Sequence, residues 1–597
     1  MLKKFNLKKI IIITSFVVIS NFKIYSQIYN PQQLIPANHW IYDAIYYLQL
    51  DSKQISLLDN SPISVAEINM FLKSIDFYSL SSRGKDLYYK IQKYLYDSKS
   101  LFSFGPVKVN LKLKLSPSFL FKTNPNIDWS FATDYTGEQN GIDSGYGSVS
   151  NYMENEFVSP IFSVPISISF DKYVMIYAEP FLGKSYWAMS EPDNITNIPM
   201  AGSDMDFLTP RNAFLSLGYS FDWWGINLHI AKEGLEIGRT TTGSVIYNSN
   251  FETDAYIQLS FFAPKFKFNI DVVEIQKNKY MYLHQFEFSI FNRIKLGLVE
   301  GTLVDGPFEI RFLNPLMIMH SFNAWDEYYT PFEKKVYGEA HISQYLGVTL
   351  DIIPFKNARI YSLYAMNELQ TLTELGSVSS NSIPDSFSFQ LGMEYNIPLK
   401  NSLNWFSFSL EGVYSSPFLY IKQGADWSLY RERFNMHSYS NIPIRSWIGT
   451  PFGPDSIGGK FKITYNYITY NYIEKFKIDF GYLFVAHGTN SFNLFDKKII
   501  VYDENGKPVE IYGYYPSVLY RNKKIKSEDA ENVGRNHFLT GVIQFTNELS
   551  IQGKYVINKN IELNSKLSFI FIYNHENIKD NFECGVEGFF NVKLSFL

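Results

Sequence analysis

The stretch "FFNVKLSFL" (residues 589–597) ends the sequence and decides the expected fold. Every second residue from Phe590 to Phe596 is apolar, and Asn591, Lys593 and Ser595 between them are polar. In a β-strand the two sets lie on opposite faces, as in strands that separate lipid from a wet interior. A strand of this kind with an aromatic residue beside the C-terminus is what the assembly machinery of outer-membrane barrels recognises, although here the aromatic residue is penultimate. We therefore expect a membrane strand that contacts this machinery during biogenesis.

The same alternation recurs upstream, beginning with "VKVNLKLKL" (residues 107–115). Clusters of Gly, Asn, Asp and Pro separate the repeats, as turn residues do. At about ten residues per strand, the chain after residue 104 has room for roughly 16 to 20 strands. Further expected strands are Phe214–Phe221, Tyr256–Phe262, Phe266–Ile270, Phe286–Ile290, Ile294–Leu298, Phe308–Phe312, Phe387–Tyr395, Trp405–Tyr414, Phe461–Ile468, Phe476–Leu483, Val542–Ile551 and Leu567–Tyr573.

The composition favours a membrane β-barrel over other classes of protein. Aromatic residues make up 17% of the 597 residues, whereas charged residues make up 19%. A helical membrane protein needs apolar runs of about 20 residues, which this sequence lacks. Barrels instead alternate lipid-facing and lumen-facing residues and carry aromatic girdles at both interfaces. The net charge of −4 gives no basic bias, so we expect no nucleic-acid partner.

The N-terminus has the pattern of a secretory signal peptide. Four lysines between Lys3 and Lys9 precede an apolar run from Ile10 to Ile19, and a cleavage site near Ser26 is consistent with the pattern. An uncleaved N-terminal anchor is the alternative, but the run is too short to span a bilayer. We therefore expect residues 1–26 to be removed and the protein to reach the outer membrane through the secretory pathway.

Residues 27–104 show helical periodicity instead of alternation. Trp40, Ala44, Tyr47 and Leu48 recur at helical spacing. Ser64 and Glu67 form a capping box that opens a second helix, and a third helix is expected from Lys85 to Tyr96. Three short helices bury little core alone, so they need a larger partner surface. The sequence thus predicts a periplasmic or plug module at 27–104 and a barrel at 105–597. Long polar stretches at 124–155, 186–210, 318–340, 420–458 and 489–535 are expected extracellular loops.

The sequence contains no short catalytic, cofactor or metal motif of the GxSxG, HExxH, CxxC or P-loop type. We therefore expect no enzymatic activity, no cofactor and no metal. Two charged groups are candidates for the barrel interior, where charges pair or line a polar path. One is Glu309 and Arg311, with Asn314 at the end of their strand; the other is Glu233, Glu236 and Arg239.

Several segments resemble the Wzi-type capsule assembly proteins, outer-membrane barrels that hold polysaccharide at the bacterial surface. "IPANHWIYDAIYYLQL" (35–50) and "PISVAEINMFLKSID" (62–76) are similar to the helical N-terminal region of that family. The turn in "LEIGRTTTGSVIYNSN" (235–250) lacks the aromatic residue that is frequent there in the family. Further similar segments are "LGLVEGTLVDGPFEIRFLNPLMIMHS" (296–321), "GVTLDIIPFKNARIYSLYAMNELQ" (347–370) and "GTPFGPDSIGG" (449–459).

The resemblance implies a mainly β fold, a large antiparallel transmembrane barrel of about 18 strands closed toward the periplasm by the helical module. It implies a non-enzymatic lectin that attaches or organises capsular polysaccharide or exopolysaccharide, with outer-membrane lipid around it. Loop rings near Trp325 and at Tyr512, Tyr514 and Tyr515 offer surfaces on which sugars stack. The residues expected to contact polysaccharide are Arg239, Glu300, Arg311, Asn314, Trp325 and Asp455.

Two other functions remain open from the residues alone. A barrel of this width with charged interior residues is also compatible with a porin-like or substrate-specific channel. A hydrolase built on barrel strands needs no short motif, and it is the weaker alternative. Conductance measured in planar bilayers distinguishes the channel hypothesis from the plugged-lectin hypothesis.

Overall fold

In the computed structural model, one large antiparallel sheet dominates the fold, with 24 strand segments among the residues that the structure describes. Its last strand, β33 (Phe582–Phe596), pairs with β32 (Ile561–Tyr573) on one side and with β5 (Leu113–Leu115) and β6 (Ser118–Lys122) on the other. The C-terminal strand predicted from the sequence is therefore confirmed, and it joins the end of the sheet to its beginning. The structure describes residues 30–596 except 37–38, 97–99, 128–132, 136–137, 140–141, 144–159, 185–195, 200–204, 208–211, 249–252, 320–330, 337–341, 370–382, 401–402, 423, 438–439, 470–471, 504 and 513–514.

Most of the expected strands are present and are longer than predicted. The remaining segments of the large sheet are β3 (Phe102–Phe104), β4 (Val107–Leu111), β10 (Phe162–Ser163), β11 (Ile166–Phe170), β12 (Val174–Ala178), β13 (Phe181–Lys184), β14 (Met205–Phe207), β15 (Ala213–Ser220), β16 (Gly225–Glu233), β17 (Asp254–Ala263), β18 (Phe266–Gln276), β19 (Lys279–Ile290), β20 (Ile294–Asp305), β21 (Ile342–Ile352), β22 (Ala358–Glu368), β23 (Ser386–Pro398), β24 (Trp405–Ser415), β27 (Ser456–Thr469), β28 (Tyr472–His487) and β31 (Gln544–Asn558).

The sheet has an apolar outer face and a polar inner face. On β23, Leu391 is 49% exposed whereas the neighbouring Gln390 is fully buried. On β31, Leu549 is 50% exposed and Glu548 beside it is 5% exposed. This alternation places apolar side chains outward and polar ones inward, which inverts the pattern of a water-soluble sheet.

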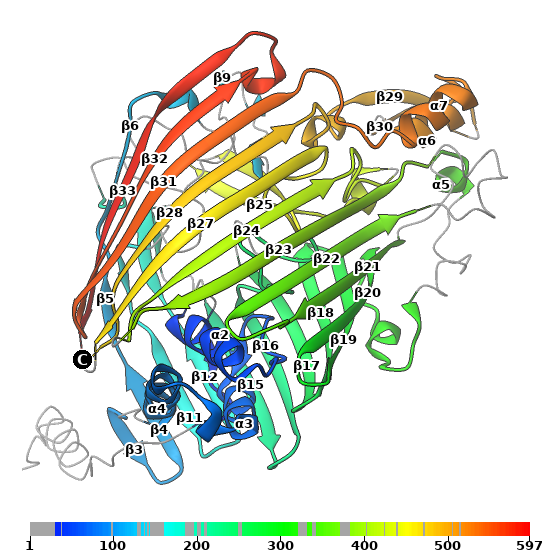
Figure 1. The fold of residues 1–597 in the computed structure, drawn as a ribbon. Coiled ribbons are helices and arrows are strands. Elements are labelled where there is room, and N and C mark those ends of the chain that lie inside the picture. Colours follow the sequence, from blue (N-terminus) through cyan, green and yellow to red (C-terminus); the bar gives the residue numbers. More distant parts are fainter. Residues whose placement is uncertain are drawn as a thin grey trace, which may run out of the picture.

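Three N-terminal helices lie together at one end of the sheet (Figure 1). They are α2 (Trp40–Ser52), α3 (Val65–Ser74) and α4 (Ser82–Tyr96), joined by the short pair β1 (Leu34–Ile35) and β2 (Ile63–Ser64). The predicted capping box is confirmed: the Ser64 side chain accepts from the Glu67 backbone, and the Glu67 carboxylate accepts from the Ser64 backbone. We call residues 30–96 the helical module. Among the described helices of the whole chain, none combines the length and the apolarity needed to cross a bilayer.

The opposite end of the sheet carries smaller elements (Figure 1). The predicted loop at 420–458 contains β25 (Tyr430–His437) and β26 (Ser440–Trp447), and β26 also pairs with β7 (Thr133–Tyr135). The predicted loop at 489–535 contains a hairpin and two helices. Its elements are β29 (Lys498–Tyr502), β30 (Pro508–Tyr512), α6 (Pro516–Arg521) and α7 (Ser527–Gly534); α5 (Pro331–Val336) lies at the same end, and β8 (Glu138–Gln139) pairs with β9 (Ile142–Asp143).

The predicted strand Phe308–Phe312 is wrong. The chain instead forms a 3-10 helix, η3 (Ile310–Leu313), in which backbone amides bond to carbonyls three residues earlier. Phe312 is fully buried against the outer face of β19 and β20, so this side chain gains more from packing there than from pairing in a strand. The other described 3-10 helices are η1 (Phe77–Ser79), η2 (Pro125–Ile127), η7 (Ala425–Trp427), η8 (Phe492–Leu494) and η9 (His575–Asn577).

Candidate functional site in the interior of the sheet

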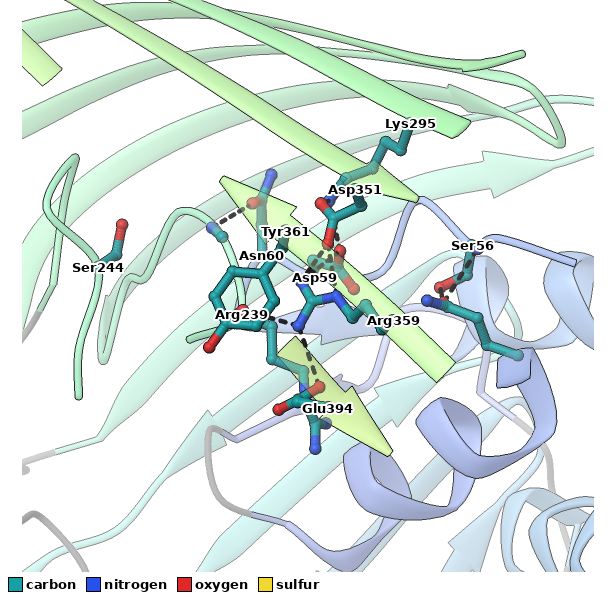
Figure 2. A network of polar contacts seen from close by, with 12 residues as sticks. Ser56, Asp59, Asn60, Arg239, Ser244, Lys295, Asp351, Arg359, Tyr361 and Glu394 are labelled. Atoms are coloured by element: carbon teal, nitrogen blue, oxygen red, sulfur yellow. Dashed lines mark hydrogen bonds and ion pairs between the residues drawn. The ribbon is translucent and has the colours of Figure 1, made fainter. Parts of the chain in front are cut away.

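A buried ionic network joins the helical module to the inner face of the sheet (Figure 2). Lys295 on β20 forms ion pairs with Asp59 of the module and, at 3.0 Å, with Asp351 on β21. Arg359 on β22 also pairs with Asp351 and lies 3.4 Å from Glu394 on β23. The side chains of Lys295, Asp59, Asp351 and Arg359 are all at most 5% exposed. Since a buried charge is costly unless paired, each of these groups holds the others in place.

A second buried pair fastens α3 to the sheet. The Lys267 ammonium on β18 lies 2.5 Å from a Glu67 oxygen, and both side chains are 4% exposed. Burial alone would raise the pKa of the Glu67 carboxyl, but Lys267 and the bonds from Ser64 outweigh burial and lower it. The Asn60 amide adds hydrogen bonds to Gln285 and Glu287 on β19. The helical module is therefore a fixed part of the fold.

Arg239 occupies the junction between the module and a loop that follows β16. Its guanidinium pairs with Asp43 of α2 at 2.8 Å and stacks 4.2 Å from the centre of the Tyr46 ring. Lys477 on β28 reaches the other Asp43 oxygen at 3.2 Å. Burial acts to raise the pKa of Asp43, but Lys477 and Arg239 outweigh it and hold the pKa well below its usual range.

A cavity of about 60 Å³ lies beside this junction. A polar cavity of this size has room for ordered water. Its lining combines charged and aromatic side chains, including Asp43, Arg239, Glu394, Trp405, Lys462 and Lys477.

The loop after β16 folds into the interior and is fixed there by hydrogen bonds. Val245, Ile246 and Tyr247 in this loop are fully buried. The Tyr345 hydroxyl on β21 donates to the Ile246 carbonyl at 2.6 Å, and the Tyr420 hydroxyl donates to the Val245 carbonyl. We call residues 234–248 the infolded loop.

The carboxylate of Glu411 on β24 anchors the tip of the infolded loop. It accepts backbone hydrogen bonds from Thr241 at 2.7 Å and from Thr242 at 2.9 Å. The Tyr361 hydroxyl donates to the same carboxylate. A buried carboxylate with several donors is satisfied, so Glu411 has a structural role in holding the loop.

A large apolar core surrounds the infolded loop and fills the interior of the sheet away from the helical module. Trp447 is fully buried and stacks on Phe492 with ring centroids 4.0 Å apart. Arg431 crosses this core to pair with Asp254 at 2.8 Å and to donate to the Trp447 carbonyl. Side chains from the wall and from the opposite-end elements contribute, including Leu363, Val413, Leu419, Ile448, Val501 and Val518. We call this cluster the interior core.

The sequence matches no protein-family model and no curated protein. Among solved structures, it is similar to Wzi, an outer-membrane protein involved in group 1 capsule assembly in Escherichia coli and a carbohydrate-binding β-barrel. That match has a TM-score of 0.52 at 11% identity and covers 94% of this chain and 99% of Wzi. OprD of Pseudomonas aeruginosa matches with a TM-score of 0.37 at 10% identity, over 82% of this chain and 96% of OprD.

The chain therefore has a β-barrel fold. The inner face of the sheet is the lumen, and both the helical module and the interior core lie within its wall. Among the described residues no group of three His, Cys, Asp or Glu side chains is arranged to hold a metal ion.

The residues predicted from the sequence as polysaccharide contacts lie in different parts of the barrel. Arg239 lies inside, at the module junction, and Glu236 in the infolded loop interacts with its charge, whereas Glu233 at the end of β16 interacts with Glu179 and Lys114. Asp455 is fully buried and accepts from Asn490 and Thr540, so it fastens the loops beyond β27 and β28. Burial raises the pKa of Asp455 to about 6, and hydrogen bonds from Thr540 and Asn490 oppose the rise.

Three other predicted contacts do not face the lumen. Glu300 shares the outer face of β20 with Leu298, which is 42% exposed. Arg311 and Asn314 belong to the segment that packs outside the sheet, so the interior position expected for Arg311 is wrong. Trp325 lies outside the described residues, as do the signal peptide and Tyr514. Tyr515 is fully buried in the interior core and offers no ring to a sugar.

The interior network around Lys295, Asp351 and Arg359 was not predicted. Each residue stands alone as a charge in an apolar strand sequence, such as Asp351 within "GVTLDII" (347–353). An isolated charge on the inner face of an expected barrel strand indicates a partner across the lumen. This pattern was available in the sequence, but the identity of the partner was not.

Proposed function

We propose that this protein is a plugged outer-membrane barrel that attaches or organises capsular polysaccharide or exopolysaccharide at the cell surface, as a non-enzymatic lectin. The observation that carries the proposal is the filled lumen. Ionic contacts fix the helical module in one end of the barrel, and the interior core occupies the space beyond it. A porin-like channel needs an aqueous path through the lumen.

A barrel of about 18 strands is part of the proposal. Its support is the pairing of β33 with β5 and β6, together with β4 to β11 and β5 to β10. The described segments are compatible with this number. They count as 18 when the interrupted strands β4–β6, β10–β11, β12–β13 and β14–β15 are each counted once and the short β3 is set aside. The apolar outer face supports placement in the outer membrane.

The polysaccharide role is supported by the likeness to Wzi, whose fold is shared over nearly the whole chain. The hairpin β29–β30 offers a surface for it at the end of the barrel opposite the helical module (Figure 1). Val501 is buried in the interior core, whereas Tyr502 is 62% exposed and Ile500 is 52% exposed. Lys498 and Glu510, half-exposed on the same hairpin, supply charged groups for polar contacts.

The test measures cell-bound and released polysaccharide in a deletion strain complemented with the wild-type protein or with Tyr502→Ala. We expect deletion to move polysaccharide from the cell-bound to the released fraction, and Tyr502→Ala to restore retention only in part. Tyr395→Ala is the matched control, because Tyr395 is 43% exposed but lies on the outer face of β23. An unchanged cell-bound fraction after deletion would contradict the proposal.

A further inference from the structure

Residues 306–319 pack against the outer face of the barrel, over β18 to β21 (Figure 1). The fully buried rings of Tyr282 and Phe312 lie 4.9 Å apart, and the Glu309 backbone amide donates to the Tyr282 hydroxyl at 2.7 Å. Leu283, the neighbour of Tyr282, points into the interior core, so Tyr282 points outward. We call residues 306–319 the outer segment.

The outer segment covers polar side chains that otherwise face outward. His284 on β19 is 1% exposed, and Thr302 on β20 is fully buried. Both alternate with lumen-facing residues and so belong to the outer face, which is apolar over most of the wall. The Gln344 amide on β21 donates to the Met319 carbonyl at 3.4 Å at the edge of the same patch. The segment thus screens a polar patch of the wall from its surroundings.

The free side of the outer segment is apolar. Leu316 is 89% exposed, Ile310 is 76% exposed and Ile318 is 64% exposed. Its two charged side chains, Glu309 and Arg311, lie 3.3 Å apart and neutralise one another. So many exposed aliphatic side chains in one short segment indicate a surface that is not in water.

We propose that the outer segment lies within the membrane and that its exposed aliphatic side chains contact lipid acyl chains. Leu298 on β20 and Leu346 on β21 are also exposed on the outer face and make the apolar surface continuous with that of the wall. The paired charges remove the cost of an uncompensated ion in lipid. The inner side of the segment covers the polar patch of the wall, and its apolar outer side contacts the lipid. This proposal rests on the membrane placement of the barrel but not on polysaccharide binding.

Site-specific fluorescence tests this placement. The single Cys584 is replaced by Ser, and one cysteine is introduced by Leu316→Cys or Ile318→Cys and labelled with bimane. Leu549→Cys on β31 is the lipid-facing control, and Lys507→Cys in the β29–β30 turn is the aqueous control. Each labelled protein is reconstituted in vesicles of phosphatidylcholine with dibrominated acyl chains, and iodide is added as the aqueous quencher.

We expect brominated lipid to quench the label at positions 316 and 318 about as strongly as at 549, and iodide to quench only the label at 507. Iodide quenching at 316 and 318, with lipid quenching retained at 549, would overturn the proposal and leave the barrel in the membrane. Protection from both quenchers would show that a second protein surface covers the segment, and would also overturn it. Loss of lipid quenching at 549 as well would contradict the membrane placement itself.

Discussion

At the scale of single residues, Lys295 has the largest predicted effect on stability. Its ammonium lies between Asp59 and Asp351, and it is fully buried. Lys295→Met removes a cation from three buried carboxylates, Asp59, Asp351 and Glu287, of which Arg359 still pairs with the first two. We therefore expect a loss of about 3–5 kcal/mol in the free energy of unfolding. Urea unfolding in phospholipid vesicles measures it.

Lys73→Met is the matched control for that substitution. Lys73 pairs with Asp222 at 3.0 Å, but the two side chains are 53% and 95% exposed. Exposed pairs contribute roughly 0–1 kcal/mol, so the control is expected to unfold close to the wild type. Equal losses for both variants would show that the Lys295 network is hydrated and contributes little.

Glu236 makes the attachment of the helical module sensitive to pH. Its backbone forms two hydrogen bonds with Ser61 of the module, at 3.0 and 3.1 Å. Burial raises the pKa of the Glu236 carboxyl to about 7; Arg239 opposes this rise and Glu411 adds to it. A pKa raised on folding gives stability that is complete below the unfolded value of about 4.5 and is lost as pH rises through about 7. We expect urea midpoints to fall between pH 5 and pH 8, and Glu236→Gln to flatten that dependence. An identical pH dependence in the variant would contradict this assignment.

At the scale of elements, the infolded loop depends on the backbone of Gly243. Its φ of +106° is unfavourable for other residues, and an added Cβ would collide with Asn248 and lie 3.0 Å from Cδ of Pro451. We expect Gly243→Ala to cost about 3 kcal/mol, from strain and overpacking together. Gly506→Ala is the control, because Gly506 also has a positive φ, +73°, but no atom lies within 4 Å of the added Cβ. For this variant we expect a loss of about 1 kcal/mol in the free energy of unfolding, from backbone strain alone. Equal costs would show that the loop relaxes to accept the methyl group.

Elements whose structure is determined by nearby residues were predicted well from the sequence. Alternation from Phe590 to Phe596 and the Ser64–Glu67 capping box each operate within a few residues, and both were found. The segment after β20 was misread because "FEIRF" (308–312) also alternates, whereas its structure is set by Tyr282 and other distant side chains of the wall. Arg239 was placed correctly inside the barrel, but its partner Asp43 is 196 residues away, and periodicity carries no information about such pairs.

At the scale of the whole molecule, two layers lie in the lumen, and we propose that together they close it. The helical module contributes one layer, through Glu67, Asp59 and Asp43, and the interior core around Val245 and Trp447 contributes the other. Most of the core is built from the wall and from loops at the far end, although Leu34 of the module also belongs to it. We therefore expect the second layer to stay in place when the module is removed, although the infolded loop then loses its contacts with Ser61 and Asp43.

Planar-bilayer conductance distinguishes this arrangement from a channel with a single plug. We expect no large stable conductance from the intact protein, and none after deletion of residues 30–96, because the interior core remains in the lumen. Heat-modifiable migration in gels verifies that the deleted form is a folded barrel. A folded deletion variant that conducts would assign closure to the module alone, because the interior core would then be too loose to exclude water. Conductance of the intact protein would instead favour the channel, since no packed core of this size is compatible with an aqueous path through the same lumen.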